Sequence, residues 1–300
     1  MLTEKPNPRT ANIDQLSSLE MLQVINDEDA TVAGAVRRTL PTIAQAVDMI
    51  TARLRDGGRL IYVGAGTSGR LGVLDAVECV PTFSTDPNMV QAIMAGGGDA
   101  LTEAVEGAED NYNAGRHAII TRQVNRQDVV VGIAASGRTP FVIGALEAAN
   151  EAGAATIAVT CNQPAPMLEI AHIPIAAVVG PEIIAGSTRL KAGSAQKMIL
   201  NMLSTASMIR LGKVYGNLMV DVKVTNQKLA ARARRIVMQV ASISEDEAAD
   251  LLQQTGNQVK PAIVMALLGI SPDEARARLD TAHGMLRDVI GPVNGSIIRD

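Results

Sequence analysis

Three loops that combine glycine with hydroxyl side chains are the parts of this sequence best suited to bind an anion. Their candidate contact residues are Gly66, Thr67 and Ser68 in the first loop, Ser136, Gly137, Arg138 and Thr139 in the second, and Ser187, Thr188, Arg189 and Lys191 in the third. Glycine lets the backbone turn sharply and approach a ligand closely. Free N–H groups at a helix N-terminus favour a negative charge there. The three loops therefore predict a phosphate-binding site.

Alternating strand and helix patterns place these loops at one edge of a sheet. Buried strands are expected at 60–63, 90–95, 128–134, 155–160 and 173–179, and helices at 27–54 (divided by Pro41), 101–115 and 189–212. Short apolar runs of this kind are typical of parallel strands. The alternation predicts a doubly wound parallel α/β sheet, and ligands of such sheets bind at the carboxyl ends of the strands.

The chain divides into three expected parts. Residues 1–51 form an N-terminal arm and helices, residues 52–224 the α/β domain, and residues 225–300 a small helical subdomain. In the last part no strand pattern is evident, and Ser244 and Ser271 each precede acidic residues in the manner of helix starts.

A dinucleotide site is the first alternative for the opening loop, because Gly64-x-Gly66-x-x-Gly69 matches a known fingerprint. That fingerprint also needs an acidic residue closing the second strand. Here the expected second strand ends in three glycines, and Asp99 follows only after them. Neutral hydroxyl donors from three loops, together with cations, fit a phosphorylated sugar better than NAD or FAD.

Composition excludes several other classes of function. The chain has 300 residues, a net charge of -4, 2% aromatic residues and no Trp, so binding of nucleic acid through basic and aromatic surfaces is not expected. The two cysteines, Cys79 and Cys161, and the three histidines show no metal-ligand spacing. The polar N-terminus and the lack of a membrane-length apolar run predict a cytoplasmic protein without a membrane partner.

Several blocks of the sequence resemble one family. The Gly-Thr-Ser and Ser-Gly-x-Thr loops are similar to the sugar isomerase (SIS) fold. More narrowly, the family resembled is that of the N-acetylmuramic acid 6-phosphate etherases, through Gly64-Ala-Gly-Thr-Ser-Gly-Arg-Leu, Asp75-Ala-x-Glu78-Cys79, Ala104-Val-Glu-Gly-Ala-Glu-Asp110, Ala134-Ala-Ser-Gly-Arg-Thr-Pro140, Gly186-Ser-Thr-Arg-Leu-Lys-Ala-Gly193 and Gly216-Asn-Leu-Met-Val-Asp221. The resemblance runs from about Ile13 into the helical tail.

The resemblance implies which residues act. It places two acid/base carboxylates at Glu78 and Glu109 and the phosphate-binding hydroxyls at Ser68, Ser136 and Thr139. It implies cleavage of the lactyl ether of N-acetylmuramic acid 6-phosphate to N-acetylglucosamine 6-phosphate and D-lactate, in the recycling of cell-wall amino sugars. Neither a cofactor nor a metal is implied.

That chemistry suits a pair of carboxylates. In the open-chain sugar the C2 proton lies next to the C1 aldehyde, so a general base can remove it. A general acid then assists the departure of lactate from C3, and water adds to the double bond. Two glutamates with different pKa values could divide these roles, and the sequence leaves open which is the base.

Other interpretations remain at this point. An aldose–ketose isomerase would use the same proton abstraction, and a non-catalytic sensor of the glucokinase regulatory protein type would share the loops without needing both carboxylates. Arg189, Lys191 and Lys197 fit intramolecular ion pairs as well as they fit a ligand.

The spacing of Ser68 and Glu78 raises a geometric question. An unbroken helix between them would be about 15 Å long, at roughly 1.5 Å per residue. One sugar phosphate cannot easily contact both ends. Either the helix stops early, or Glu78 serves the site of a neighbouring subunit. The second interpretation predicts a homodimer with its active site near the subunit interface.

Overall fold

A parallel five-stranded sheet forms the centre of the first half of the protein. The computed structural model describes residues 1–222, 224 and 226–292. The strands are β1 (Leu60–Gly64), β2 (Val90–Met94), β3 (Val129–Ile133), β4 (Ala155–Thr160) and β5 (Ile173–Ala176), in the order β2-β1-β3-β4-β5. All neighbouring strands are parallel. The predicted doubly wound α/β sheet is confirmed.

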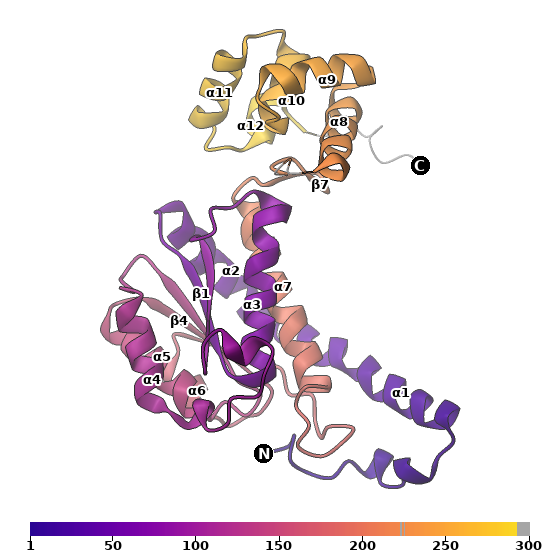
Figure 1. Cartoon of the computed structure of the whole chain (residues 1–300), viewed down its shortest axis with the longest axis vertical. Helices are drawn as coiled ribbons and strands as arrows, with labels where there is room; N and C mark the ends of the chain where they lie inside the picture. Colours follow the sequence, from indigo (N-terminus) through magenta and orange to yellow (C-terminus); the bar gives the residue numbers. More distant parts are fainter. Residues whose placement is uncertain (223, 225, 293–300) are drawn as a thin grey trace. The chain divides into compact units, whose positions relative to one another are not determined.

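Helices cover both faces of this sheet, as Figure 1 shows. These helices are α2 (Leu40–Arg55), α3 (Gly66–Phe83), α4 (Tyr112–Thr121), α5 (Pro140–Glu151), α6 (Pro166–Ile170) and α7 (Lys191–Arg210). Ile61 and Val63 of β1 pack into a buried cluster with Val142 and Leu146 of α5. Tyr62 points to the opposite face, where Gly72 lets α3 approach the ring closely. The alternation of β1 side chains thus fastens a helical layer to each face.

The N-terminal region contains a capped helix. Helix α1 (Ser18–Arg37) starts at Ser17, whose hydroxyl oxygen accepts a hydrogen bond from the N–H of Glu20 in a reciprocal capping box. Two short 3-10 turns, η1 (Pro8–Thr10) and η2 (Ile13–Gln15), precede it. Pro41 lies in the first turn of α2, so the predicted break between two helices is confirmed.

One predicted helix is wrong. The segment expected to be helical over 101–115 contains two 3-10 turns, η3 (Asp99–Leu101) and η4 (Ala108–Asp110), and α4 starts only at Tyr112. Gly107 has a φ of 72°, in the left-handed region that interrupts a helix. The side chain of Asn111 then accepts from the N–H of Ala114 and caps α4. The apolar spacing in this segment did not reveal these two local signals.

The chain forms two compact units. The first comprises Met1–Val77 and Pro87–Thr205, and the second comprises Glu78–Asp86 with the chain from Ala206 onward. Each unit is defined by residues that contact one another more than they contact the rest of the chain. The three-part division expected at residues 51 and 224 stays a prediction.

The second unit is largely helical. It contains a short hairpin of β6 (Val214–Tyr215) and β7 (Leu218–Met219), followed by α8 (Gln227–Ala241), α9 (Glu245–Gln254), α10 (Val259–Leu268), α11 (Pro272–Thr281) and α12 (Leu286–Ile290). The apolar α10 supplies much of its core. Ser244 and Ser271 cap α9 and α11 as predicted.

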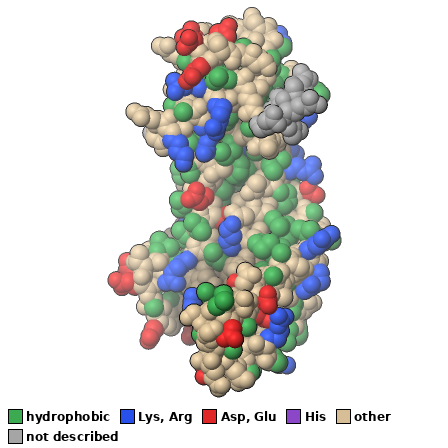
Figure 2. Space-filling view, turned by 90° about the vertical axis from the view of Figure 1, so that its right-hand side faces the viewer, with side chains coloured by type: hydrophobic (Ala, Val, Ile, Leu, Met, Phe, Trp, Pro, Cys, Tyr) green, Lys and Arg blue, Asp and Glu red, His purple; other side chains and the backbone are tan. Residues whose placement is uncertain are grey.

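The surface drawn in Figure 2 carries both signs of charge. Lys, Arg, Asp and Glu side chains are interspersed with hydrophobic ones on that face, rather than forming a continuous stripe. Among the described helices, none combines the length and the apolar character needed to cross a membrane.

Candidate active site

A cavity of about 400 Å³ lies in the first unit, at the carboxyl ends of the strands. The predicted residues that line it are Gly66, Thr67, Ser68, Glu109, Ser136, Arg138, Thr139 and Thr188. All three hydroxyl loops thus contribute to one cavity, as parallel strand ends require. Of the other predicted site residues, Gly137, Ser187, Arg189, Lys191 and Glu78 do not line it.

The turn between β1 and α3 brings Ser68 to the cavity. Gly66 adopts a φ of 53°, which permits the sharp turn into the helix. The Ser68 hydroxyl is buried and lies 2.9 Å from Oε1 of Gln196 on α7. The Nε2 atom of Gln196 is buried and has no hydrogen-bond partner among the described residues. Exchanging the two ends of this amide would let Nε2 donate to Ser68 Oγ, which would free the hydroxyl proton for a ligand.

The loop after β3 offers hydroxyl donors that are not already donating to acceptors of the protein. The N–H of Arg138 donates to Ser136 Oγ at 3.1 Å, so the hydroxyl proton of Ser136 remains available to an anion. Thr139 is the N-cap residue of α5, and its side chain makes no capping hydrogen bond. Gly137 has a φ of 65°, and a Cβ there would lie 2.5 Å from Cβ of Ala165. Gly137 therefore shapes the loop although it does not line the cavity.

The third loop contributes less than the sequence predicts. Gly186 and Thr188 line the cavity. Lys191 instead lies in the interior with 3% of its side chain exposed, where its Nζ is 2.6 Å from Glu28 Oε2 and 3.1 Å from the carbonyl of Pro181. Buried Glu28 needs a cation, and Lys191 supplies it. In this structure Lys191 thus forms an ion pair between α1 and α7, and its role as a phosphate ligand stays a prediction.

Hydrogen bonds keep Glu28 ionised in this interior position. Burial opposes its ionisation, but hydrogen bonds from Lys191 and Asn7 outweigh burial and hold the pKa of Glu28 below its ordinary value. Arg9 adds a further ion pair at 3.1 Å. The network fastens the N-terminal segment to α1 and α7.

Glu109 is the predicted catalytic residue that the cavity contains. It lies in η4, the 3-10 turn that replaces the expected helix, and its side chain is exposed. Asp110 lines the same cavity. Arg138 is the cation among the lining side chains, beside the carboxylates of Glu4, Glu109 and Asp110. An anion in this cavity would therefore be held mainly by hydroxyl groups, backbone N–H groups and the N-termini of α3 and α5.

Glu78 lies elsewhere on α3. The helix is continuous from Gly66 to Phe83, so the explanation that it stops before Glu78 is excluded. Glu78 is exposed, and it shares one face of α3 with Leu74 and Val77, which are 52% and 62% exposed. The structure separates it from the residues that line the cavity by about ten residues of helix, or roughly 15 Å of rise from Ser68.

Asp75 anchors the segment of α3 that precedes Glu78. Its carboxylate accepts hydrogen bonds from Tyr62 Oη at 2.8 Å and from Asn201 Nδ2 and Ser204 Oγ at 3.1 Å each. Burial raises the pKa of Asp75 above its ordinary value, although the Tyr62 and Ser204 hydrogen bonds oppose that rise. These contacts join α3 to β1 and α7 and fix the helix orientation.

The N-terminal segment belongs to the cavity, which sequence reasoning missed. Met1 and Glu4 line it. Asn162, just after β4, accepts from the N–H of Leu2 at 2.7 Å and donates to Thr3 Oγ1 at 3.0 Å. The N–H of Gly186 donates to the carbonyl of Thr3. These residues carry no periodic pattern, so the sequence signals only a polar arm.

Similarity to known proteins covers nearly the whole chain. Family models match at residues 42–150 (glucokinase regulatory protein N-terminal SIS domain), 111–206 (SIS domain) and 216–262 (C-terminal lid domain of glucokinase regulatory protein). An N-acetylmuramic acid 6-phosphate etherase 2 of Vibrio cholerae is 56% identical over 96% of this chain and 94% of its own length. A relative of the same name from Lactiplantibacillus plantarum is 54% identical over 97% of this chain and 98% of its own length.

A solved structure agrees on the fold. A putative phosphosugar isomerase involved in capsule formation from Bacteroides fragilis superposes with a TM-score of 0.51, at 16% identity, over 72% of this chain and 97% of its own. This likeness concerns the SIS fold alone. The identity to the etherases over almost the full length decides the family: the chain belongs to the N-acetylmuramic acid 6-phosphate etherases.

Proposed function

We propose that this protein is a carbon–oxygen lyase that cleaves the D-lactyl ether of N-acetylmuramic acid 6-phosphate, giving N-acetylglucosamine 6-phosphate and D-lactate. The observation that carries this proposal is the 54–56% identity to etherases over about 96% of the chain. A cavity rich in hydroxyl donors, with a carboxylate at its edge, supports it. Incubation with the substrate and an assay for D-lactate tests it, and absence of lactate would contradict it.

The reaction follows from the acidity of the sugar. In the open-chain form the C1 aldehyde acidifies the C2 proton, and a glutamate removes it as general base. The electron pair forms the C2–C3 double bond while the C3–oxygen bond breaks. A general acid protonates the departing lactyl oxygen. Water then adds its oxygen to C3 and a proton to C2, which restores the hydroxyl. The family resemblance implies that Glu78 and Glu109 carry out these proton transfers, and it does not distinguish their roles.

The phosphate would be held by the turn of α3 and the loop before α5. Ser68, Ser136 and Thr139 are the proposed hydroxyl ligands, and the N–H groups of the two helix N-termini add to them. Their neutral donors suit a phosphate in a cavity where carboxylates outnumber cations. Glu109 lies at the same cavity, which would place a proton-transfer group near the sugar.

Gln196 is expected to act through Ser68. If its amide donates to Ser68 Oγ, replacing Gln196 with Met removes the hydrogen bond that orients the Ser68 hydroxyl toward the phosphate. We expect KM for the substrate to rise about tenfold, the loss of one hydrogen bond to a charged group, with kcat less affected. In a Ser68→Ala background the same change should have little further effect, because the residue through which Gln196 acts is gone. Additive effects of the two changes would contradict this interpretation.

Glu78 fits the site of a partner subunit better than its own. The continuous helix leaves about 15 Å of rise between Ser68 and Glu78, which exceeds the reach of one hexose phosphate. Leu74 and Val77 give the surface around Glu78 an apolar character that a second copy of the chain would cover. We therefore propose a homodimer in which each site takes its second carboxylate from the other subunit.

Mixing two inactive variants tests this sharing. Glu78→Gln and Ser136→Ala proteins, each inactive alone, should regain up to about one quarter of wild-type activity when equal amounts exchange subunits, since one of the two sites in each mixed dimer is then intact. Exchange is followed with differently tagged chains. If mixed dimers form and no lactate appears, Glu78 acts within its own subunit or not at all.

The cytoplasmic location expected from the sequence stays a prediction.

A further inference from the structure

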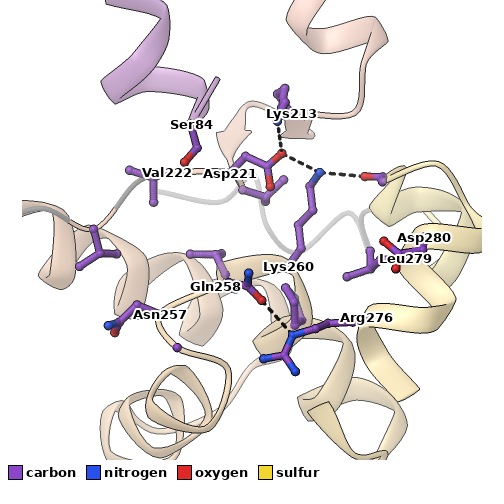
Figure 3. A pocket seen from close by; sticks show the side chains of 16 residues that line it. Ser84, Lys213, Asp221, Val222, Asn257, Gln258, Lys260, Arg276, Leu279 and Asp280 are labelled. Carbon is purple, nitrogen blue, oxygen red and sulfur yellow. Dashed lines mark hydrogen bonds and ion pairs between the residues drawn. The ribbon is translucent and has the colours of Figure 1, made fainter. Parts of the chain in front are cut away.

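The second unit contains a cavity of its own, about 540 Å³ in volume. Residues flanking the β6–β7 hairpin, the turn between α9 and α10, and helix α11 line it, as Figure 3 shows. Its volume lies within the range of small-molecule sites. None of the residues discussed above as binding or catalytic groups lines it.

Two lysines in this cavity share one carboxylate oxygen. Lys260 Nζ lies 2.8 Å and Lys213 Nζ 3.1 Å from Oδ2 of Asp221. Only 8% of the Lys260 side chain is exposed, against 22% for Lys213 and 21% for Asp221. Figure 3 shows both ammonium groups directed at this carboxylate. One carboxylate cannot neutralise two cations, so a positive charge remains in a partly buried place.

The rest of the lining adds donors to this excess charge. Arg276 from α11 is held by Gln258 Oε1 at 3.1 Å and by the carbonyl of Thr255 at 3.3 Å, and it also pairs with the exposed carboxylate of Asp273 at 3.0 Å. Because Oε1 of Gln258 is occupied, its amide N–H groups remain to donate. Asp280 is the second carboxylate of the lining. Since Asp273 pairs with Arg276, the excess positive charge lies at Lys213 and Lys260, which share the one carboxylate of Asp221.

We propose that this cavity binds a small phosphate-bearing anion, either inorganic phosphate or a phosphorylated metabolite. A phosphate group carries about 1.5 to 2 negative charges at neutral pH and offers several acceptor oxygens. Lys260 donates to Asp221 and to the carbonyl of Gly284, which leaves one of its three N–H groups for a ligand. Lys213 and the Gln258 amide supply further donors. The anion would neutralise the charge that Asp221 leaves uncompensated.

Burial gives independent support. It lowers the pKa of Lys260 below its ordinary value, although Asp221 opposes that shift. Holding Lys260 charged therefore has a cost when no anion is bound. A bound anion reduces this cost, so ligand binding and the charged form of Lys260 favour each other.

Titration calorimetry with inorganic phosphate tests the proposal in the full-length chain. A Ser136→Ala background weakens any binding at the candidate active site. In that background Lys213→Gln should weaken phosphate binding about tenfold, the loss of one charge-assisted hydrogen bond. It should fold normally because Lys260 still pairs with Asp221. Lys228→Gln, which removes the same charge from an exposed position of α8 outside the cavity, is the matched control.

A second variant should bind phosphate more tightly, which misfolding could not produce. Asp280→Asn removes a carboxylate from the lining and should tighten phosphate binding about two- to fivefold. Equal affinities for Lys213→Gln and Lys228→Gln, or no phosphate binding at all in the Ser136→Ala background, would overturn the proposal. Lactate release measured separately keeps this outcome distinct from failure of the proposed reaction.

The same titration distinguishes the two sources of phosphate. N-acetylglucosamine 6-phosphate, inorganic phosphate and unphosphorylated N-acetylglucosamine are compared in the Ser136→Ala and Ser136→Ala/Lys213→Gln proteins. Binding of the sugar phosphate that is tighter than that of phosphate and sensitive to Lys213→Gln identifies a phosphorylated metabolite. Equal binding of both identifies phosphate itself. Equal binding of the unphosphorylated sugar would contradict an anion site.

Discussion

Replacing Glu109 with Gln is expected to lower the rate of D-lactate release by about 10²–10⁴-fold, the usual contribution of a general acid or base. Glu109 is the predicted proton-transfer group that lines the cavity, and its side chain is exposed, so the amide should be tolerated without loss of folding. The change keeps the shape of the side chain and removes its ability to exchange a proton. Steady-state lactate assays with the purified protein give the size of the effect.

The control for Glu109 lies three residues earlier on the same loop. Glu106 is exposed and does not line this cavity, although it lines an adjoining pocket with Glu109, so Glu106→Gln should lose far less activity than Glu109→Gln. Exchange of the C2 proton with deuterium from solvent then separates the roles. If Glu109 is the base, Glu109→Gln loses exchange as well as lactate release; if it is the acid, exchange persists. Similar lactate rates for Glu106→Gln and Glu109→Gln would contradict a catalytic role for Glu109.

Replacing Lys191 with Met is expected to destabilise the protein by up to about 3–5 kcal/mol, the cost of removing one member of a buried ion pair, because the more exposed Arg9 compensates Glu28 only in part. Glu28 would keep its charge in an environment where 5% of its side chain is exposed. Denaturant unfolding measures the loss. Activity per folded molecule should change little, because Lys191 does not line the cavity. A stable variant with a strongly raised KM would instead support the phosphate-ligand interpretation that the sequence suggested.

A double variant isolates the buried charge as the cause. Glu28→Gln combined with Lys191→Met removes both charges and keeps an acceptor for the Asn7 amide, so it should be more stable than Lys191→Met alone. Stability of the wild type should also depend on pH. The pKa of Glu28 is lowered in the folded state, so its contribution is present above the unfolded-state pKa of glutamate and is lost as the pH falls through the lower folded-state value. In Glu28→Gln this part of the pH dependence should be absent.

Strong local patterns explain which parts of the fold could be predicted. Val129–Ile133 is a continuous apolar run and is buried at every position, so its identity as a strand was readable from residue type alone. Glycines beside hydroxyl residues at the strand ends likewise predicted where the cavity lies. Parallel strand ends must meet at one edge, which is why Ser68 and Ser136, far apart in sequence, line one cavity.

Features that depend on contacts between distant parts of the chain could not be predicted from the sequence. Lys191 lies in a loop that looks suited to phosphate, and only the fold reveals that Glu28, in a distant helix, is its partner. The N-terminal segment carries no pattern, and its place at the cavity depends on Asn162. The helix expected over 101–115 is wrong at Glu109 because Gly107 adopts a left-handed conformation that interrupts it. The roles of Glu78 and Glu109 stay predictions.

In the proposed reaction the ether is cleaved by elimination followed by addition of water. Incubation with N-acetylmuramic acid 6-phosphate in water enriched in oxygen-18 tests it most directly, with mass spectrometry of both products. The label should enter the C3 hydroxyl of N-acetylglucosamine 6-phosphate and be absent from the lactate hydroxyl, because the C3–oxygen bond is the one that breaks. Label in the hydroxyl of lactate, with none at C3, would contradict the mechanism, and no release of lactate would contradict the proposed function itself.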